Sequence, residues 1–358
     1  MDIFGNIILL AAGFLLLTKG ADFFVDGASG IATKLKIPQI IIGLTIVAMG
    51  TSAPEAAVSI SAAVAQNAEI TIGNIVGSNI LNILIILGLS SVITLLGVKK
   101  DTSFVDIPVM IGATVILLLL GLDGTIGLWD GIIFLVVFIA YMAYLFVIAR
   151  KRINKRAAAV PLAQNTVATH MPAADMPTAD EVLSATDALP QSNAQSAAAE
   201  NAEEDNQPKD RPFILALFFT ALGLAMIILG SNFAVDSATY LAAKMGVSDR
   251  FIGLTVVALG TSLPELFTSV AAAIKKNADI AIGNIVGSNI FNILFITGLS
   301  AVITPVPFAS NFLIDTGVAL GAAVLLWIPC LFRQGIGRIT GIIMLLAYCG
   351  YFTYLAIG

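Results

Sequence analysis

A polar motif occurs twice in this chain, at a constant offset of 210 residues. Residues 43–94 and 253–304 align without a gap, and 35 of the 52 aligned positions are identical. Each copy contains Gly-Thr-Ser-x-Pro-Glu and Asn-Ile-Val-Gly-Ser-Asn in apolar surroundings. A duplicated structural helix would keep its pattern of Leu and Ile while its polar residues diverged. Because the polar residues are kept here, we predict one polar site built from both halves of the chain.

The composition excludes an ordinary soluble domain. Hydrophobic residues make up 58% of the chain and charged residues 11%, and the mean hydropathy is +0.96. Soluble domains contain about 25% charged residues. Long apolar stretches joined by short charged loops are typical of α-helical proteins that cross the membrane several times. The predicted fold class is therefore an all-α polytopic membrane protein.

Ten membrane spans are predicted, in two sets of five. They are separated by residues 157–210, which are rich in Ala, Pro, Asn, Gln, Ser and acidic residues. This segment has no sustained apolar period, which is typical of a disordered linker. The predicted spans cover residues 4–32, 38–66, 70–97, 104–121, 127–149, 212–242, 248–274, 280–304, 311–332 and 338–357.

The basic residues predict the orientation of the spans, because Lys and Arg favour cytoplasmic loops. With the N-terminus outside, 15 of the 18 Lys and Arg residues fall on the cytoplasmic side. Five spans per half is an odd number, so the second half enters the membrane inverted, as in many secondary transporters. We expect an inner-membrane protein with both termini extracytoplasmic. It comprises a first inverted repeat over residues 1–149, a cytoplasmic and largely disordered linker over 150–211, and a second inverted repeat over 212–358.

The first part of the motif concentrates oxygen atoms on one face of a helix. Thr51 and Ser52 precede Glu55 by four and three positions, so their side chains converge. Pro54 cannot donate a hydrogen bond to the carbonyl of Gly50, so we expect the helix to loosen there. Carbonyls freed near Ala48 are tolerated inside a membrane only if they line a cavity. The second copy supplies the same set at Ala258, Gly260, Thr261, Ser262, Pro264 and Glu265.

The second part of the motif predicts a polar stripe on the following helix. Asn74, Ser78 and Asn82 follow one another at intervals of four, and the second copy has Asn284, Ser288 and Asn292. Carboxylate, hydroxyl, amide and carbonyl oxygens without thiolate or imidazole suit hard cations such as Na⁺ and Ca²⁺. Hydrogen bonding within or between helices is the alternative for the Thr, Ser and Asn side chains. Asn74, Asn79, Asn284 and Asn289 fit an architectural role as well as a ligating one.

At these residues the chain resembles the calcium/cation antiporter superfamily, specifically a prokaryotic member of the sodium/calcium exchangers. The resemblance implies a ten-helix fold of two inverted repeats, with spans 2, 3, 7 and 8 as broken helices. It implies exchange of Ca²⁺ for Na⁺ by alternating access at a site in the middle of the membrane. It assigns the ion site to Ala48, Thr51, Ser52, Glu55, Ser78 and Asn82, and to Ala258, Thr261, Ser262, Glu265, Ser288 and Asn292.

The sequence leaves other transport functions open. A Ca²⁺/H⁺ antiporter, or an antiporter of another divalent cation, uses the same carboxylates, and a passive cation channel is a further alternative. Some relatives, including potassium-dependent exchangers, have Asp where this chain has Asn292, so the resemblance disfavours K⁺ co-transport here. We predict no enzyme activity and no cofactor. The expected partners are Ca²⁺ and Na⁺ as substrates and the lipid bilayer, with no nucleic acid and no obligate protein partner.

Overall fold

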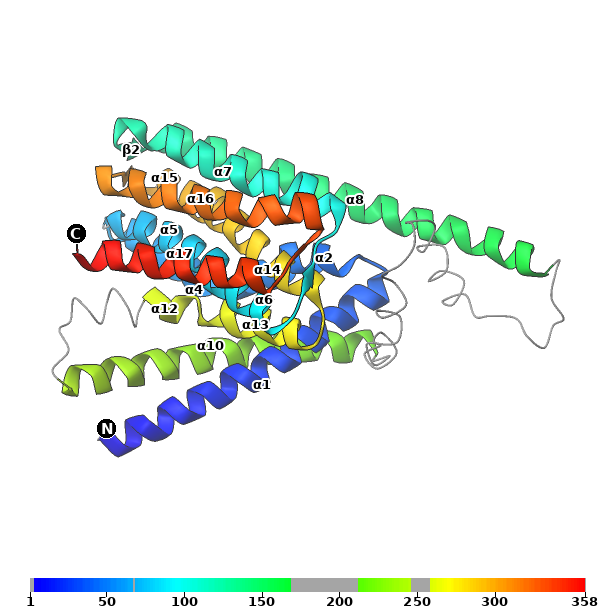
Figure 1. Cartoon of the computed structure of the whole chain (residues 1–358), viewed down its shortest axis with the longest axis horizontal. Coiled ribbons are helices and arrows are strands. Elements are labelled where there is room, and N and C mark those ends of the chain that lie inside the picture. Colours follow the sequence, from blue (N-terminus) through cyan, green and yellow to red (C-terminus); the bar gives the residue numbers. More distant parts are fainter. Residues whose placement is uncertain (1–2, 67, 169–211, 246–257, 358) are drawn as a thin grey trace.

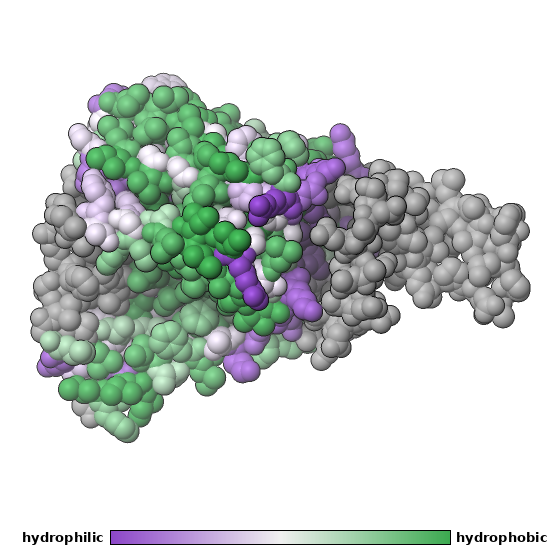
Figure 2. Space-filling view, viewed as in Figure 1, coloured by the Kyte–Doolittle hydropathy of each residue, from purple (hydrophilic) through white to green (hydrophobic). Residues whose placement is uncertain are grey.

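The computed structural model describes residues 3–66, 68–168, 212–245 and 258–357, and most of them are helical (Figure 1). Helix α1 (Ile3–Leu35) begins and helix α17 (Arg338–Ile357) ends at one end of the helix bundle, and helix α8 (Leu128–Ala168) extends from the other end (Figure 1). Apolar residues cover much of the visible face, while hydrophilic residues gather toward the end from which α8 extends (Figure 2). This distribution fits the predicted membrane protein.

Eight of the described helices are long and apolar enough to cross a membrane, and nine are if one bent pair counts as a single span. The first ten residues of the predicted span 248–274 lie outside the described residues, so that span is described only in part. Besides α8, the long spans are formed by α1 (Ile3–Leu35), α5 (Glu69–Leu81) with α6 (Gly88–Ile93), α7 (Ile107–Leu120), α10 (Phe213–Lys244), α14 (Ala278–Ile290) with α15 (Gly298–Ile303), α16 (Ser310–Arg333) and α17 (Arg338–Ile357).

The two spans that carry the polar stripes form the centre of the bundle. In their most apolar windows 78% and 83% of the residues are buried, against at most 39% in the other long spans. We expected these spans to be broken, and that expectation is wrong. Because neither contains Pro, each is continuous, and its two α-helices are joined by a π-helical segment, Asn82–Leu87 in one and Phe291–Thr297 in the other. Such π-helical turns are frequent at functional sites.

The second span is broken as expected. It bends by 51° between Gln39–Thr51 and Ala53–Val64, which is α4. Ser52 lies at the bend and Pro54 in the first turn of α4, where its missing N–H costs no helical hydrogen bond. The first part contains α2 (Gln39–Ile42), a π-helical segment over Gly43–Val47, and α3 (Ala48–Thr51). In the second half, α12 (Ala258–Thr261) and α13 (Leu263–Ile274) meet at Ser262 in the same way.

Helix α8 is longer than predicted. We expected the fifth span to end near residue 149, but the helix runs to Ala168, into the stretch predicted to be a disordered linker. Its extension is rich in Ala, Lys and Arg, which are good helix formers, and the helix continues through Pro161. The rest of the predicted linker, residues 169–211, lies outside the described residues.

The two halves repeat each other in backbone detail and pair with each other. Strand β1 (Leu96–Gly97) pairs with β4 (Gly335–Ile336), and β2 (Thr125–Ile126) pairs with β3 (Val306–Pro307), both antiparallel. Strands β1 and β3 are equivalent positions of the repeat, 210 residues apart, and so are β2 and β4. The two strand pairs are therefore equivalent to each other, and each joins one half of the chain to the other. Positive φ angles recur at equivalent turns, 59° at Gln66 and 55° at Lys276.

Helices α1 and α10 pack closely along one side of the bundle (Figure 1). A Cβ atom added at Gly13 would lie 2.9 Å from the carbonyl oxygen of Gly230, and one added at Gly20 would lie 2.9 Å from that of Gly223. Glycine allows this backbone contact, as is common between membrane helices. Gly13 and Gly20 are equivalent to Gly223 and Gly230 in the repeat. The contact of Gly13 with Gly230 is therefore equivalent to that of Gly223 with Gly20.

A second glycine contact joins α14 to the first part of span 2. A Cβ atom at Gly283 would lie 2.9 Å from the carbonyl oxygen of Ile40 and 3.0 Å from the Cα of Gly43. Its equivalent in the first half, Gly73, is exposed, and a Cβ atom added there would lie 3.7 Å from a ring carbon of Phe312, with no backbone atom of another helix nearer. The same motif position is therefore crowded in one half and open in the other.

We predict that Gly283→Ala destabilises the protein by about 1–3 kcal/mol, because backbone atoms must move to admit the methyl group. Gly73→Ala is the matched control, and it leaves stability unchanged or raises it, because Ala favours helix and meets no backbone atom. Thermal unfolding of both purified variants in detergent measures the difference. Equal melting temperatures would contradict the close contact at Gly283.

Candidate functional site

Two carboxylates from different halves lie buried at the centre of the bundle. Glu55 on α4 is 1% exposed and Glu265 on α13 is 0% exposed. Ser52 Oγ donates a hydrogen bond to Glu265 Oε1 at 2.8 Å, and Ser262 Oγ donates to Glu55 Oε1 at 3.3 Å. Each carboxylate is therefore held by a hydroxyl of the opposite half. Other hydroxyls interact with the same carboxylates, those of Thr51 and Ser288 with Glu265 and that of Thr261 with Glu55.

The helix breaks at Ser52 and Ser262 explain why the carboxylates sit where they do. Ser52 and Ser262 are the N-cap residues of α4 and α13, and each Glu lies in the first turn that follows. The N–H groups of a first turn have no partner within the helix, and the helix dipole favours an anion there. Each break thus creates a helix start inside the bundle, where a carboxylate is stabilised.

The carbonyl oxygen of Ala48 is already in use. It accepts hydrogen bonds from the backbone N–H of Ser52 at 3.0 Å and from the hydroxyls of Thr51 at 3.3 Å and Ser288 at 3.4 Å. These contacts join α3 to α14, one from each half. Our expectation of a freed carbonyl at Ala48 is therefore not met in this conformation. Its predicted counterpart Ala258 begins α12.

Asn74 and Asn284 brace the helices that carry the two Glu residues. Asn74 Nδ2 donates to Ser59 Oγ at 3.0 Å and to the carbonyl of Glu55 at 3.3 Å. Asn284 Nδ2 donates to Ser269 Oγ at 2.9 Å and reaches the carbonyl of Glu265 at 3.5 Å. Asn284 Oδ1 also accepts from Thr51 Oγ1 at 2.9 Å. Of the two roles that the sequence left open for these asparagines, the contacts favour the architectural one.

Four oxygens of the site have no hydrogen-bond partner among the described residues. They are Glu55 Oε2, Glu265 Oε2, Asn82 Oδ1 and Asn292 Oδ1, all buried. The other unpartnered buried atoms in the described residues are hydroxyl oxygens, which can rotate to donate or accept. Carboxylate and amide oxygens only accept, and leaving such an atom buried without a partner costs free energy. A cation can coordinate oxygens of this kind, whereas an anion or a second acceptor leaves them unsatisfied.

The remaining predicted residue, Ser78, is 3% exposed and lies one turn before Asn82 on α5. Within the described residues, no three His, Cys, Asp or Glu side chains come together in a way that suits a metal ion. Among the described residues, a cation held here therefore has at most two carboxylate ligands, and its other ligands are hydroxyl, amide or carbonyl oxygens. Such a set fits a hard cation and not a transition metal that prefers sulfur or nitrogen.

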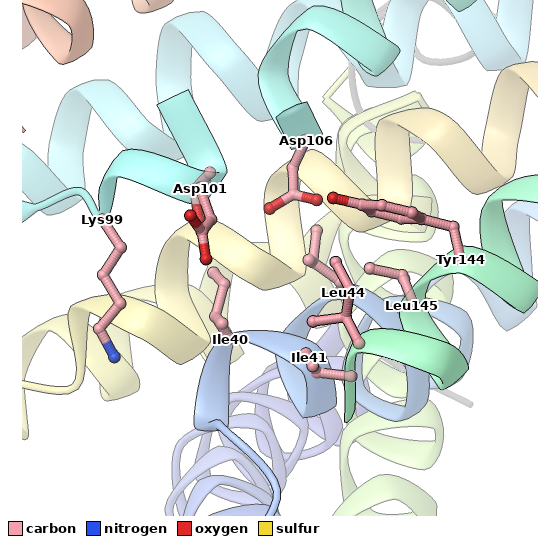
Figure 3. A pocket seen from close by; sticks show the side chains of 10 residues that line it. Ile40, Ile41, Leu44, Lys99, Asp101, Asp106, Tyr144 and Leu145 are labelled. Atoms are coloured by element: carbon pink, nitrogen blue, oxygen red, sulfur yellow. The ribbon is translucent and has the colours of Figure 1, made fainter. Parts of the chain in front are cut away.

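A cavity of about 30 Å³ lies elsewhere, between α2, the π-helical segment Thr102–Asp106 and α8 (Figure 3). Its walls include Lys99, Asp101 and Asp106, and none of the twelve predicted site residues. Asp106 accepts a hydrogen bond from the hydroxyl of Tyr141 at 3.1 Å, and the side chain of Tyr144 points toward it (Figure 3). These contacts join the start of α7 to α8, so we assign Asp106 to the packing of these helices.

The chain is similar to known exchangers over almost its whole length. A profile of the family described as sodium/calcium exchanger protein matches residues 5–147 and again residues 215–357. The inner membrane protein YrbG of Escherichia coli is 33% identical over 324 residues, which cover 89% of this chain and 88% of that protein. The sodium/calcium exchanger MaX1 of Methanosarcina acetivorans is 32% identical, over 98% of both chains. A solved structure of the sodium-calcium exchanger NCX_Mj, soaked with Na⁺ and Sr²⁺, matches with a TM-score of 0.76 and 28% identity, over 98% of this chain and 99% of that one.

We predict that Glu55→Gln and Glu265→Gln each weaken Ca²⁺ binding by more than about 100-fold, because each removes one of two buried negative charges that face the ion. Isothermal titration of the purified protein with Ca²⁺ measures the loss. Asp123→Asn, which removes an exposed acid in a turn, is the control and retains the affinity of the unchanged chain. Retained affinity in both Glu variants would show that the carboxylates do not hold the cation.

Proposed function

The chain belongs to the sodium/calcium exchanger protein family, and on this premise we propose that it is a secondary antiporter that exchanges Ca²⁺ for Na⁺ across the inner membrane. The observation that carries the proposal is the set of four buried acceptor oxygens without a partner, on Glu55, Glu265, Asn82 and Asn292. Two carboxylates balance one divalent ion, and oxygens are the ligands that Ca²⁺ and Na⁺ take. The names of the relatives MaX1 and NCX_Mj support the same pair of ions.

In our proposal the fold consists of ten spans in two inverted repeats. Support comes from contacts that recur when the halves are exchanged, as with Ser52 to Glu265 and Ser262 to Glu55. The family profile also matches each half separately. Inverted repeats with the site between them provide two related half-sites, one facing each side of the membrane. The distribution of Lys and Arg supports our proposal that residues 150–211 lie in the cytoplasm and both termini outside.

Exchange follows from competition for the same oxygens. Glu55 and Glu265 lie close enough to repel each other when both are ionised, so the site is stabilised by either Ca²⁺ or Na⁺ between them. Because the two ions share these ligands, full binding of one displaces the other. The site then opens to one side of the membrane at a time, and each opening exchanges one cation for the other.

The coupling ion is tested with ⁴⁵Ca uptake into proteoliposomes that contain the full chain. We expect an outward Na⁺ gradient to drive uptake while the pH is equal and clamped on both sides. An imposed proton gradient without Na⁺ is the matched experiment, and we expect no uptake from it. Uptake driven by protons alone would replace the proposal with Ca²⁺/H⁺ antiport. Ca²⁺ flux that needs no counter-ion on the other side would indicate a channel.

Membrane potential gives a separate prediction about stoichiometry. If three Na⁺ replace one Ca²⁺, each cycle moves one net charge, which is worth about 2.3 kcal/mol per 100 mV. We therefore expect a valinomycin-imposed potential to change the initial rate of Na⁺-driven Ca²⁺ uptake, and reversing the potential to change it in the opposite direction. An initial uptake rate that does not change with the potential would indicate electroneutral exchange of two Na⁺ for each Ca²⁺. The control tests whether K⁺ itself is required, by comparing uptake with and without K⁺ at zero potential. Because the chain has Asn292 where potassium-dependent exchangers have Asp, we expect equal uptake.

A further inference from the structure

Four buried asparagines link the two central spans where they meet. Asn79 and Asn82 belong to the first half, Asn289 and Asn292 to the second, and each is at most 3% exposed. Asn79 and Asn289 are equivalent positions of the repeat. Each donates its Nδ2 to the backbone carbonyl of the other, at 3.3 Å in both directions. The two residues thus form a reciprocal pair, in which each half of the chain makes the same hydrogen bond to the other half.

The backbone carbonyls fix the orientation of the Asn79 and Asn289 amides. A carbonyl oxygen can only accept, so the NH₂ group of each side chain must face it. A reversed amide would set two acceptors against each other and leave its own NH₂ group without the carbonyl. The Oδ1 atoms of Asn79 and Asn289 therefore point away from these carbonyls, and this follows from the hydrogen-bond network.

That orientation in turn fixes the amides of Asn82 and Asn292. Asn292 Nδ2 donates to Asn79 Oδ1 at 3.1 Å, and Asn82 Nδ2 donates to Asn289 Oδ1 at 2.9 Å. The NH₂ groups are held in this way, whereas Asn82 Oδ1 and Asn292 Oδ1 have no partner. An amide that is not held can turn its NH₂ group toward the site, where its partial positive charge repels a cation.

We propose that Asn79 and Asn289 are positioning residues that act across the repeat. Asn79 holds the oxygen of Asn292 toward the transported cation, and Asn289 does the same for Asn82. This inference rests on the proposed cation site and adds residues to it that do not themselves bind the ion. It also makes the ligands of each half depend on the other half, because neither Asn82 nor Asn292 is oriented by its own span.

The first test is Ca²⁺ binding to the purified full-length protein in detergent, measured by isothermal titration. We expect Asn79→Ala and Asn289→Ala each to weaken binding about 10- to 100-fold, as is common for residues that orient metal ligands. Thermal unfolding without added cation reports whether each variant is folded. Asn79→Leu replaces Asn79→Ala if the latter does not fold, because Leu fills a similar volume but offers Asn292 no oxygen to donate to.

Double-mutant cycles separate positioning from a structural role. If Asn79 acts through Asn292, Asn79→Ala causes no further loss of affinity in an Asn292→Ala background. The cross pair is the matched control, so Asn79→Ala and Asn82→Ala reduce affinity by independent factors that multiply. Loss factors that multiply for both pairs would overturn the proposal, because a purely structural role of Asn79 does not distinguish its two neighbours.

An Asn292→Asp background gives the sharpest outcome. A carboxylate has two equivalent oxygens, so it needs no neighbour to set its orientation. It also faces Asn79 Oδ1 as a second acceptor. In this background we therefore expect Asn79→Ala to leave Ca²⁺ affinity unchanged or to raise it. A further loss of 10-fold or more in this background would contradict the positioning role.

The failure of this inference is distinguishable from the failure of the proposed function. If the unchanged protein binds Ca²⁺ but the cycles show independent losses, only the positioning role is wrong. If the unchanged protein binds neither Ca²⁺ nor Na⁺ in the same titration, both are wrong. If proteoliposomes take up Ca²⁺ in a proton gradient without Na⁺, the proposed coupling ion is wrong. The proposal that Asn79 and Asn289 position the Ca²⁺ ligands is not affected by that result.

Discussion

Two carboxylates buried in the middle of a membrane protein set the constraint on which the rest of this structure depends. Each ionisable side chain costs about 2.5–3.5 kcal/mol at the centre of a membrane helix. The chain offsets this cost by starting a helix at the carboxylate, so that unpaired N–H groups and the helix dipole face it. That requires a break in spans 2 and 7, and Ser52 and Ser262 mark these breaks. The bend is thus part of the site.

The same two serines tie the halves together. Because the hydroxyl of Ser52 serves Glu265 and that of Ser262 serves Glu55, neither half completes its carboxylate environment alone. The reciprocal pair Asn79 and Asn289 repeats this arrangement at the adjoining spans. Buried polar groups in a membrane need partners, and here many partners come from the other repeat. These hydrogen bonds therefore hold the two halves against each other at the centre of the bundle.

Features that depend on the duplicated polar residues could be predicted from the sequence, whereas features that depend on packing between helices could not. The pairing of the two Glu residues and the break before Pro54 follow from the motif, because Pro removes a donor wherever it lies. The continuity of spans 3 and 8 was missed, since glycines and asparagines allow either a break or a π-helical turn. The end of α8 was missed because Ala, Lys and Arg favour a helix whether or not it lies in a membrane. The roles of Asn74 and Asn79 depend on contacts between spans, which no spacing within one span determines.

The repeat is not exact, and the departures fall at one end of the bundle. Lys275 Nζ donates to Asp26 Oδ1 at 2.6 Å and to the carbonyl of Asp22 at 2.8 Å, which ties the turn after α13 to α1. The equivalent of Lys275 is Ala65 and that of Asp22 is Asn232, so the other end has no matching ammonium group. Gly283 likewise closes tightly on Gly43 at this end. Exposed ion pairs contribute at most about 1 kcal/mol, but even that changes an equilibrium between two conformations about fivefold. In the proposed cycle of alternating access, the two arrangements related by exchange of the halves therefore differ in free energy, although the motif at their centre is nearly the same.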